Sequence, residues 1–183
     1  MTGPKTGIRV AHTADLDAAT LEQARSLLFE VFTGDDAMTD EDWEHCVGGM
    51  HALAYDEGEL VGHASVVMRR LLHGDRALRA GYVEGVAVRE DRQGRGHGAG
   101  MMAELERIIR RAYDLGALGA TEVAVPFYRG RGWQPWRGET WALTTTGPVR
   151  TPDEDGWIYV LPAAATLDLD GTLVCGIRPG EAW

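Results

Sequence analysis

A short glycine-rich segment holds the residues whose types and spacing most directly suggest chemistry. Gln93 is followed by Gly96 and Gly98, after an apolar stretch that ends in Val88 and before a run of helix-forming residues. Glycine lets the backbone approach a ligand closely, and the first turn of a helix offers unpaired N–H groups and a partial positive charge. A strand, a glycine turn and a helix in this order therefore predict a phosphate-binding site.

The glycine spacing excludes two common phosphate-binding motifs. A P-loop requires Gly-x-x-x-x-Gly-Lys-Ser/Thr, and the sequence contains no such run. A dinucleotide fingerprint requires Gly-x-Gly-x-x-Gly, whereas Gly94 and Gly96 are followed by glycines at 98 and 100 and not at 99. An ordinary strand-to-helix turn, with glycines for packing, is the structural alternative.

Composition bounds the class of protein. The 183 residues predict a single domain, residues 1–183, and the net charge of −10 disfavours nucleic acid as a partner and suits a cationic ligand. No apolar run has membrane-spanning length, so we expect no membrane partner and a cytoplasmic protein. Cys46 and Cys175 form neither a CxxC pair nor a disulfide framework, and we expect free thiols and no metal.

Periodicity predicts the elements that must position the glycine turn, in an α+β fold. We expect an N-terminal strand, a helix capped by Thr13 or Asp15, and three antiparallel strands with a tight turn at Glu57–Gly58. The predicted elements up to the glycine turn are a strand at 8–12, a helix ending near Phe32, and strands at 50–56, 60–72 and 78–88.

After the turn, a helix is predicted from an apolar stripe, and its members are Met101, Leu105, Ile108, Ala112 and Leu115. A strand at 117–123, a short helix at 126–131 and a strand at 157–161 follow. The segment 147–156 is expected to be a loop, and the tail to Trp183 is expected to be irregular. Trp133, Trp136 and Trp141 are expected in the core and in its walls.

Two acidic stretches each leave two interpretations open. The stretch from Gly34 to Glu44 is either a solvated helix start, with Thr39 as N-cap and Asp42 completing a capping box, or a negative rim for a polycation. The three acids at 153–155 are either a surface turn or a group that faces cations.

Two motifs resemble the GNAT acyltransferases: Gln93-x-x-Gly96-x-Gly98, and Tyr128-x-x-x-Gly132-Trp133 on a short helix. The resemblance implies a mixed, mostly antiparallel central sheet flanked by helices, with strands splayed at an acetyl-coenzyme A site. It implies that acetyl-coenzyme A is the cosubstrate.

Further blocks are similar to the aminoglycoside 2'-N-acetyltransferases of mycobacteria and related bacteria. They are Asp42-Trp43-Glu44-His45, residues 48–52 and 81–88, Tyr113-x-Leu115-Gly116-Ala117-Leu118, Arg131-Gly132-Trp133-x-Pro135-Trp136, Thr146-Gly147-Pro148, Arg150-Thr151-Pro152 and the final Trp183. This resemblance implies acetyl transfer to the 2'-amine of a polycationic aminoglycoside, a link to antibiotic resistance, and a homodimer.

The resemblance also implies roles for single residues. Glu84 would be the base, through water and together with the Trp183 carboxylate, and Tyr128 would be the acid. The backbone of Val86, Ala87 and Val88 would bind the pantetheine arm, and the turn of Gln93, Gly94, Arg95, Gly96, His97 and Gly98 would hold the pyrophosphate. The aminoglycoside site would be lined by Asp35, Asp42, Glu84, Gly85 (through its backbone), Asp153, Glu154 and Trp183.

Several alternatives remain open at this stage. The segment from Asp36 to Asp40 is longer than in the family, which leaves the choice between Asp35 and Asp36 undecided, and residues 121–127 depart from it as well. Glu84 is alternatively a strand-end acid at a bulge beside Gly85, and Tyr128 an aromatic core residue. The substrate is alternatively another amine, such as a polyamine, a cell-wall amino sugar or a protein N-terminus, and the domain is alternatively a non-catalytic acyl-coenzyme A sensor.

Overall fold

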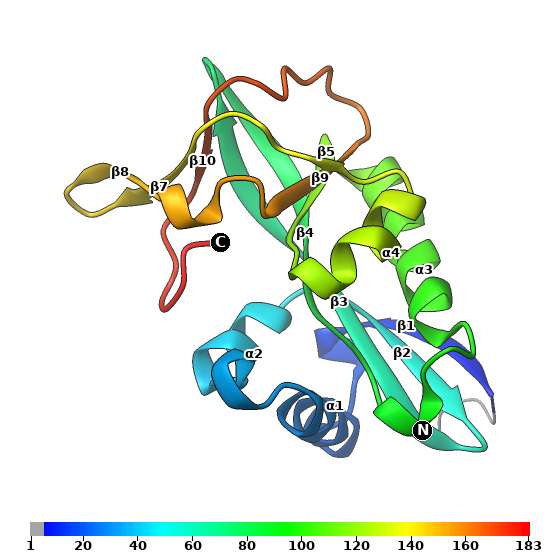
Figure 1. Ribbon diagram of the computed structural model, residues 1–183. Coiled ribbons are helices and arrows are strands. Elements are labelled where there is room, and N and C mark those ends of the chain that lie inside the picture. Colours follow the sequence, from blue (N-terminus) through cyan, green and yellow to red (C-terminus); the bar gives the residue numbers. More distant parts are fainter. Residues whose placement is uncertain (1–5) are drawn as a thin grey trace. The chain divides into compact units, whose positions relative to one another are not determined.

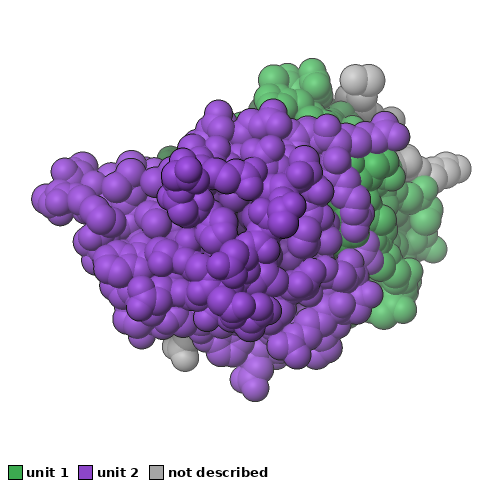
Figure 2. Space-filling model, turned by 90° about the horizontal axis from the view of Figure 1, so that it is seen from above, with its two compact units in different colours: residues 1–67, 83–107 green, residues 68–82, 108–183 purple. Residues whose placement is uncertain are grey.

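The computed structural model describes residues 6–183, apart from the side chain of Asp35. The chain divides into two compact units, coloured green and purple in Figure 2: residues 1–67 with 83–107, and residues 68–82 with 108–183. We call them unit 1 and unit 2. Strands β3 (Glu59–His73) and β4 (Arg76–Val88) and helix α3 (His97–Ala112) run from one unit into the other.

Unit 1 contains an antiparallel set of strands that the alternating sequence predicted (Figure 1). Strand β1 (Gly7–His12) pairs with β2 (Met50–Asp56), and β2 pairs with β3. The β2–β3 turn uses Glu57 and Gly58, which have φ values of 54° and 90°. Two successive residues in the left-handed backbone region match the twist of a tight hairpin, which explains why a glycine occupies position 58.

Helices cover both faces of these strands within unit 1. Helix α1 (Ala18–Val31) packs through Ala24 against Leu53 and Tyr55 of β2. On the opposite face a Cβ atom at Gly62 of β3 would lie 3.0 Å from Met101 Cε of α3. Because both faces are covered, residues 61–66 of β3 are all buried, including the polar His63 and Ser65.

Two sequence predictions about helices α1 and α3 are wrong in detail. Neither Thr13 nor Asp15 caps α1: they lie in the 3₁₀ turn η1 (Thr13–Asp15), and the cap is Asp17, whose carboxylate accepts from the Thr20 N–H at 2.8 Å. In α3 the buried residues are Met101, Met102, Leu105, Glu106 and Ile109. The buried face of the helix therefore includes Ile109 in place of Ile108, because a spacing of three or four residues is helical for either choice. Leu115 lies in the next strand and not in the helix.

Unit 2 is built around β5 (Leu115–Gly119), β9 (Ile158–Pro162) and the first half of β4. Strand β9 is antiparallel to β5 and also pairs with the short β6 (Gln134–Pro135). Strand β5 is parallel to β4, but the pairing covers only three residue pairs and ends at Tyr82 and Ala117. Strand β4 nevertheless continues to Val88. Its residues after Tyr82, which include the Glu84-to-Val88 segment of the predicted site, therefore do not pair with β5.

The tail contributes a strand that the sequence did not predict. Strand β10 (Leu173–Cys175) pairs antiparallel with β3 and parallel with β7 (Thr140–Thr144), and β7 forms a hairpin with β8 (Gly147–Arg150). The segments at 147–150 and 173–175 are therefore strands, not loop and irregular tail. Both are shorter than five residues, which is too short for a periodic signal.

Tryptophan packing closes the core of unit 2. A Cβ atom at Gly116 would lie 2.9 Å from the Trp133 ring, and Trp136 is fully buried with its indole N–H donating to Gly171 O at 2.8 Å. The expected strand at 117–123 is wrong beyond Gly119: a 3₁₀ turn η4 (Glu122–Ala124) leads directly into helix α4 (Val125–Gly130). The mixed sheet with flanking helices confirms the α+β class.

Candidate active site

The glycine turn lies between the end of β4 and the start of α3, as predicted. Gly94 and Gly96 have φ values of 73° and 86°, and a Cβ atom built on either would meet nothing within 4 Å. The Gly100 N–H donates to Gly96 O at 2.9 Å, which starts the helix immediately after the turn. The start of a helix of 16 residues thus adjoins an open, left-handed backbone turn, an arrangement that fits a phosphate group.

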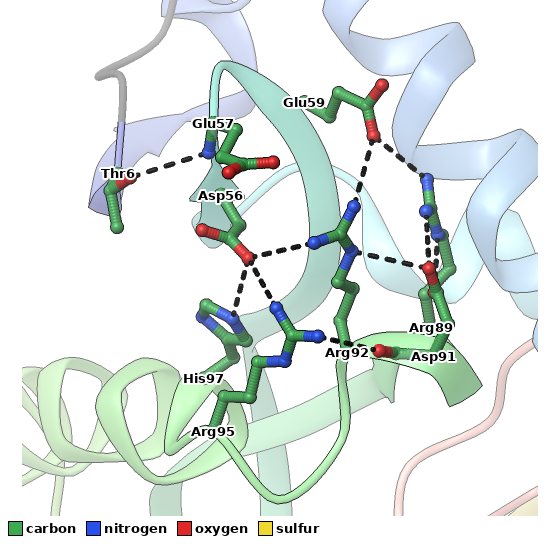
Figure 3. A network of polar contacts seen from close by, with 9 residues as sticks. All are labelled: Thr6, Asp56, Glu57, Glu59, Arg89, Asp91, Arg92, Arg95 and His97. Atoms are coloured by element: carbon green, nitrogen blue, oxygen red, sulfur yellow. Dashed lines mark hydrogen bonds and ion pairs between the residues drawn. The ribbon is translucent and has the colours of Figure 1, made fainter.

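Charged side chains of the turn converge on one acid of the β2–β3 hairpin (Figure 3). Asp56 Oδ2 accepts from Arg92 Nη1 at 3.3 Å and from Arg95 Nη1 at 3.2 Å, and His97 Nε2 lies 4.0 Å away. Asp56 and Arg92 are both largely buried, with side-chain exposures of 16% and 18%. Asp56 therefore acts as an internal counter-ion of the turn, a role that sequence reasoning missed because 36 residues separate it from Arg92.

The entry to the turn is held by a second ionic group. Arg89 donates to both carboxylate oxygens of Asp91 at 3.0 Å and lies 3.5 Å from Glu59 Oε2 (Figure 3). The Arg89 hydrogen bond, partly offset by burial, lowers the pKa of Asp91. The Gln93 amide donates to Val88 O at 3.1 Å, so the first motif residue ties the turn to the end of β4.

The backbone of β4 departs from the extended conformation at Gly85, and we call Glu84 and Gly85 together the Glu84–Gly85 bulge. Gly85 has a φ of 57°, and a Cβ atom there would lie 2.7 Å from Cys46 Sγ and 3.0 Å from Leu28 Cδ1. Only glycine satisfies both the conformation and the space. Glu84 is half-buried beside it. A left-handed glycine at this point of the strand is compatible with either role considered for Glu84.

The residues after the bulge combine a buried side chain with an extended backbone. Ala87 is 4% exposed and packs in a cluster with Leu27, Leu28 and Cys46, while Val86 and Val88 are half-buried. These residues lie beyond the last pair formed with β5. Their place in the fold fits the predicted backbone contact with an extended arm.

The acidic stretch at 34–44 contains the predicted helix start. Helix α2 (Asp40–Cys46) has a capping box in which Asp42 Oδ2 accepts from the Thr39 N–H at 2.9 Å and from its hydroxyl at 2.7 Å. Asp40 forms an ion pair with Arg25 at 2.5 Å. One oxygen of Asp42 is thus engaged in the cap. The predicted substrate role of Asp35 lies outside the described residues, since its side chain is not described.

In unit 2, Tyr128 lies on α4 with 6% exposure. Its ring contacts those of Phe127 and Trp133, with centroids 5.3 and 6.2 Å apart. Burial raises the pKa of Tyr128 to about 12, so the hydroxyl is protonated at neutral pH. A hydroxyl in that state can donate a proton but cannot accept one as a base.

Arginines hold the C-terminal residues in place. Arg178 donates to the main-chain oxygen of Trp183 at 2.5 Å, and Arg69 donates to that of Ala182 at 2.6 Å. The Trp183 side chain is 7% exposed, and its indole N–H donates to the Thr151 hydroxyl at 3.0 Å. Trp183 is therefore fixed at both its backbone and its ring.

The acids at 153–155 divide into two kinds. Asp155 accepts from buried Thr140 and pairs with Arg150, and the Arg150 bond contributes most to lowering its pKa to about 2. Glu154 is half-buried, and its pKa is raised by burial and then by the charges of Glu181 and Asp153, against a lowering by Arg178. Asp155 thus stabilises the loop, whereas Asp153, Glu154 and Glu181 form an acidic group; sequence reasoning missed Glu181.

The candidate residues fall into two sets. Unit 1 contains Asp42, the Glu84–Gly85 bulge, residues 86–88 and the turn at 93–98, and unit 2 contains Tyr128, Asp153, Glu154 and Trp183. Within residues 6–183, no cluster of His, Cys, Asp and Glu suits a metal ion. Among the helices described here, none is long and apolar enough to cross a membrane.

Comparison with known proteins agrees with this geometry. The family model of the acetyltransferase (GNAT) domain matches residues 12–136. The chain is 48% identical over 179 residues, 96% of its length, to an aminoglycoside 2'-N-acetyltransferase of Mycolicibacterium fortuitum, of which it covers 91%.

Solved structures share the fold at low identity. The GNAT N-acetyltransferase YhbS of Escherichia coli, solved with CoA, matches with a TM-score of 0.64 and 16% identity, over 96% of this chain and 93% of that one. Eis1 of Mycobacterium abscessus matches with a TM-score of 0.60 and 21% identity over 74% of this chain, which spans only 33% of Eis1. The chain therefore belongs to the GNAT family and is an N-acetyltransferase.

Proposed function

We propose that this protein transfers the acetyl group of acetyl-coenzyme A to the 2'-amino group of aminoglycosides. The observation that carries the proposal is the 48% identity, over 96% of the chain, to a protein named for this reaction. The acidic group of Asp153, Glu154 and Glu181 supports it, because an aminoglycoside carries several positive charges.

The coenzyme site is assigned to the glycine turn and the strand before it. The open backbone at Gly94 and Gly96, the adjacent start of α3 and the arginines beside Asp56 all suit a pyrophosphate. The backbone of Val86, Ala87 and Val88 would pair with the pantetheine arm. Acetyl-coenzyme A supplies a thioester carbonyl that is open to attack by an amine.

Glu84 and Tyr128 are assigned the two proton transfers. Glu84 accepts the proton that the attacking amine loses, through water and together with the carboxylate of Trp183. As the new C–N bond forms and the C–S bond breaks, the Tyr128 hydroxyl donates its proton to the leaving sulfur. The Tyr128 hydroxyl is protonated at neutral pH and so has a proton to donate. No side chain is acetylated in this direct transfer.

The substrate contacts are assigned to acids and to one backbone carbonyl. Asp35, Asp42, Asp153 and Glu154 would pair with ammonium groups, Gly85 would contribute its carbonyl oxygen, and Trp183 its carboxylate. Glu181 would join these acids, because its charge acts on Glu154. The homodimer, the single domain and the cytoplasmic location remain predictions.

The decisive experiment compares two aminoglycosides that differ only at the 2'-position. Kanamycin B has a 2'-amine and kanamycin A a 2'-hydroxyl, and thiol release from acetyl-coenzyme A reports transfer to either. We expect turnover of kanamycin B alone. Equal turnover of both would overturn the 2'-assignment and keep the acetyltransferase, and turnover of spermidine but of neither kanamycin would establish a polyamine substrate instead.

A further inference from the structure

Two fully buried histidines connect the Glu84–Gly85 bulge to the far end of β2. His63 Nδ1 lies 2.8 Å from the carbonyl oxygen of Gly85, and His63 Nε2 lies 2.9 Å from His51 Nδ1. His51 Nε2 in turn lies 2.8 Å from the Thr13 hydroxyl, which accepts from the Gly48 N–H at 2.8 Å. Four contacts thus run in an unbroken line from β4 through β3 and β2; we call this line the histidine chain.

The groups at its ends fix every proton in the histidine chain. A carbonyl oxygen only accepts, so His63 Nδ1 must carry the hydrogen that it donates to Gly85 O. The Nε2 atom of neutral His63 is then an acceptor, His51 Nδ1 is the donor to it, and His51 Nε2 accepts from the Thr13 hydroxyl. The Thr13 hydroxyl also lies 3.2 Å from Gly49 O, but its single hydrogen is needed by His51 Nε2, because two acceptors would otherwise face each other at 2.8 Å.

Both imidazoles are neutral at neutral pH. Burial lowers the pKa of His51 to about 3, with smaller contributions from His63 and His12. Burial lowers the pKa of His63 to about 4, against a raising effect of its bond to Gly85. Each neutral ring has one donor and one acceptor nitrogen, as the assignment of donors and acceptors above requires.

The histidine chain cannot carry a proton away from the reaction, because it ends on an amide carbonyl, which is not a base at neutral pH. It can orient that carbonyl. Successive carbonyls of a regular strand point in opposite directions, yet those of Glu84 and Gly85 both approach side chains of β3, with Ser65 Oγ 3.4 Å from Glu84 O. The left-handed Gly85 accounts for this turn of the backbone, and the His63 side chain donates to the carbonyl that has been turned toward it.

We propose that His63, oriented by His51, is a positioning residue that holds the Glu84–Gly85 bulge in its working conformation. The inference rests on the proposed function, in which Glu84 is the base and Gly85 a substrate contact. Rotation of either peptide plane of the bulge would move the Glu84 side chain and the Gly85 carbonyl together. Removal of the His63 donor should therefore slow the chemical step and weaken aminoglycoside binding, while acetyl-coenzyme A binding is kept.

Two substitutions of His63 separate its two bonds. The amide nitrogen of asparagine occupies the place of Nδ1, so His63→Asn keeps the donor to Gly85 and loses the contact with His51. The terminal amide of glutamine occupies the place of Nε2, so His63→Gln keeps the contact with His51 and loses the donor to Gly85. Loss of the donor to a buried carbonyl costs about 1–3 kcal/mol. The conformation at Gly85 is therefore destabilised only in His63→Gln.

We expect kcat for kanamycin B to fall about 10-fold or more in His63→Gln and to stay within about threefold of wild type in His63→Asn. The KM for acetyl-coenzyme A should be unchanged in both variants. Thermal unfolding of both variants measures the structural effect, which should be similar. Equal loss of kcat in the two variants, or wild-type kcat in His63→Gln, would overturn the inference.

A milder variant covers the case in which His63→Gln does not fold. Thr13→Val keeps the shape of the side chain and removes the hydroxyl that orients His51 at the far end of the histidine chain. A fall in kcat of about two- to fivefold with an unchanged coenzyme KM supports the inference, and an unchanged kcat contradicts it. Absence of turnover by the wild-type enzyme would instead refute the proposed function.

Discussion

The guanidinium of Arg69 lies over the ring of Tyr82, 4.6 Å from its centroid, and donates a 2.6 Å hydrogen bond to the main-chain oxygen of Ala182. Arg178 approaches the same ring at 5.7 Å and donates to Trp183 O. A single tyrosine on β4 thus supports both arginines that orient the last residues of the sequence. Stacking restricts the guanidinium planes and so fixes the directions in which their N–H groups point.

Substitution Arg69→Ala should release the peptide that precedes Trp183. We expect kcat for kanamycin B to fall about 10-fold, because charge-assisted hydrogen bonds to the main-chain oxygens of Ala182 and Gly176 and one stacking contact are lost. Steady-state kinetics would measure the loss of turnover, and calorimetry would show whether coenzyme binding is retained. The control is Arg70→Ala, whose side chain is exposed; equal effects of the two variants would show that the tail does not depend on Arg69.

Substitution Tyr128→Phe should lower kcat about 100-fold or more if the hydroxyl protonates the leaving sulfur. Since the pKa of Tyr128 is raised to about 12, the acid form persists to high pH, and the wild-type rate should show no decline from this group below about pH 11. A pH–rate profile checks both points. Tyr113→Phe is the control, and a decline near pH 10 that disappears in Tyr128→Phe would contradict the assigned pKa.

Substitution Asp56→Asn removes the shared partner of Arg92 and Arg95. These side chains must then be ordered when the coenzyme binds, so we expect the KM for acetyl-coenzyme A to rise about fivefold with little change in kcat. Glu57→Gln is the matched control, because it removes the same charge from the next residue, which is exposed. If the KM for acetyl-coenzyme A in Asp56→Asn is no higher than in Glu57→Gln, Asp56 does not help to order the arginines. Its negative charge would then only repel the phosphates of the coenzyme.

Substitutions of Asp155 and Glu154 in the 153–155 loop should affect different properties, stability for the first and substrate KM for the second. Asp155→Asn should lower the free energy of unfolding by about 1 kcal/mol, since buried Thr140 loses a charged partner. Glu154→Gln should leave stability unchanged and raise the KM for kanamycin B several-fold. Urea denaturation and kinetics on both variants test this division, and a reversed pattern would exchange the two roles.

Acid should destabilise the protein through the two buried histidines. Their pKa values in the folded state, about 3 and about 4, lie below the unfolded value of 6.5, so the unfolded chain binds more protons in that interval. The free energy of unfolding should therefore fall as pH decreases from about 6.5, by on the order of 2 kcal/mol for each histidine and about 4 kcal/mol for both at pH 5. Urea midpoints at pH 7 and pH 5 measure the fall, and His51→Asn/His63→Asn should show a smaller one.

Strand and helix positions could be predicted where periodicity was long. The strand at Met50–Asp56 has the predicted bounds, and the hairpin at Glu57–Gly58 is where the glycine indicated. The start of α1 was wrong because three polar residues, Thr13, Asp15 and Asp17, all suit an N-cap, and only tertiary packing chooses among them. Strand β10 gave no local signal, since it is specified by its neighbours β3 and β7.

The site was predictable only where it is local in sequence. The glycine turn and the bulge at Gly85 follow from residue type and spacing. Asp56, His63 and Arg69 did not stand out, because each acts through a partner 22 to 113 residues away. His63 in particular looks like any polar residue on a strand until its partner, a carbonyl turned by a left-handed glycine, is known.

The one-way direction of the histidine chain makes its imidazole nitrogens natural spectroscopic reporters. A protonated Nδ1 and an unprotonated Nε2 in His51 and in His63 give each ring one pyrrole-type and one pyridine-type ¹⁵N resonance. These signals come from rings that no solvent reaches, next to a peptide that the substrate is proposed to contact. Any change in the hydrogen bond to Gly85 O would therefore alter resonances from the protein's own interior, without any label on the substrate or the coenzyme.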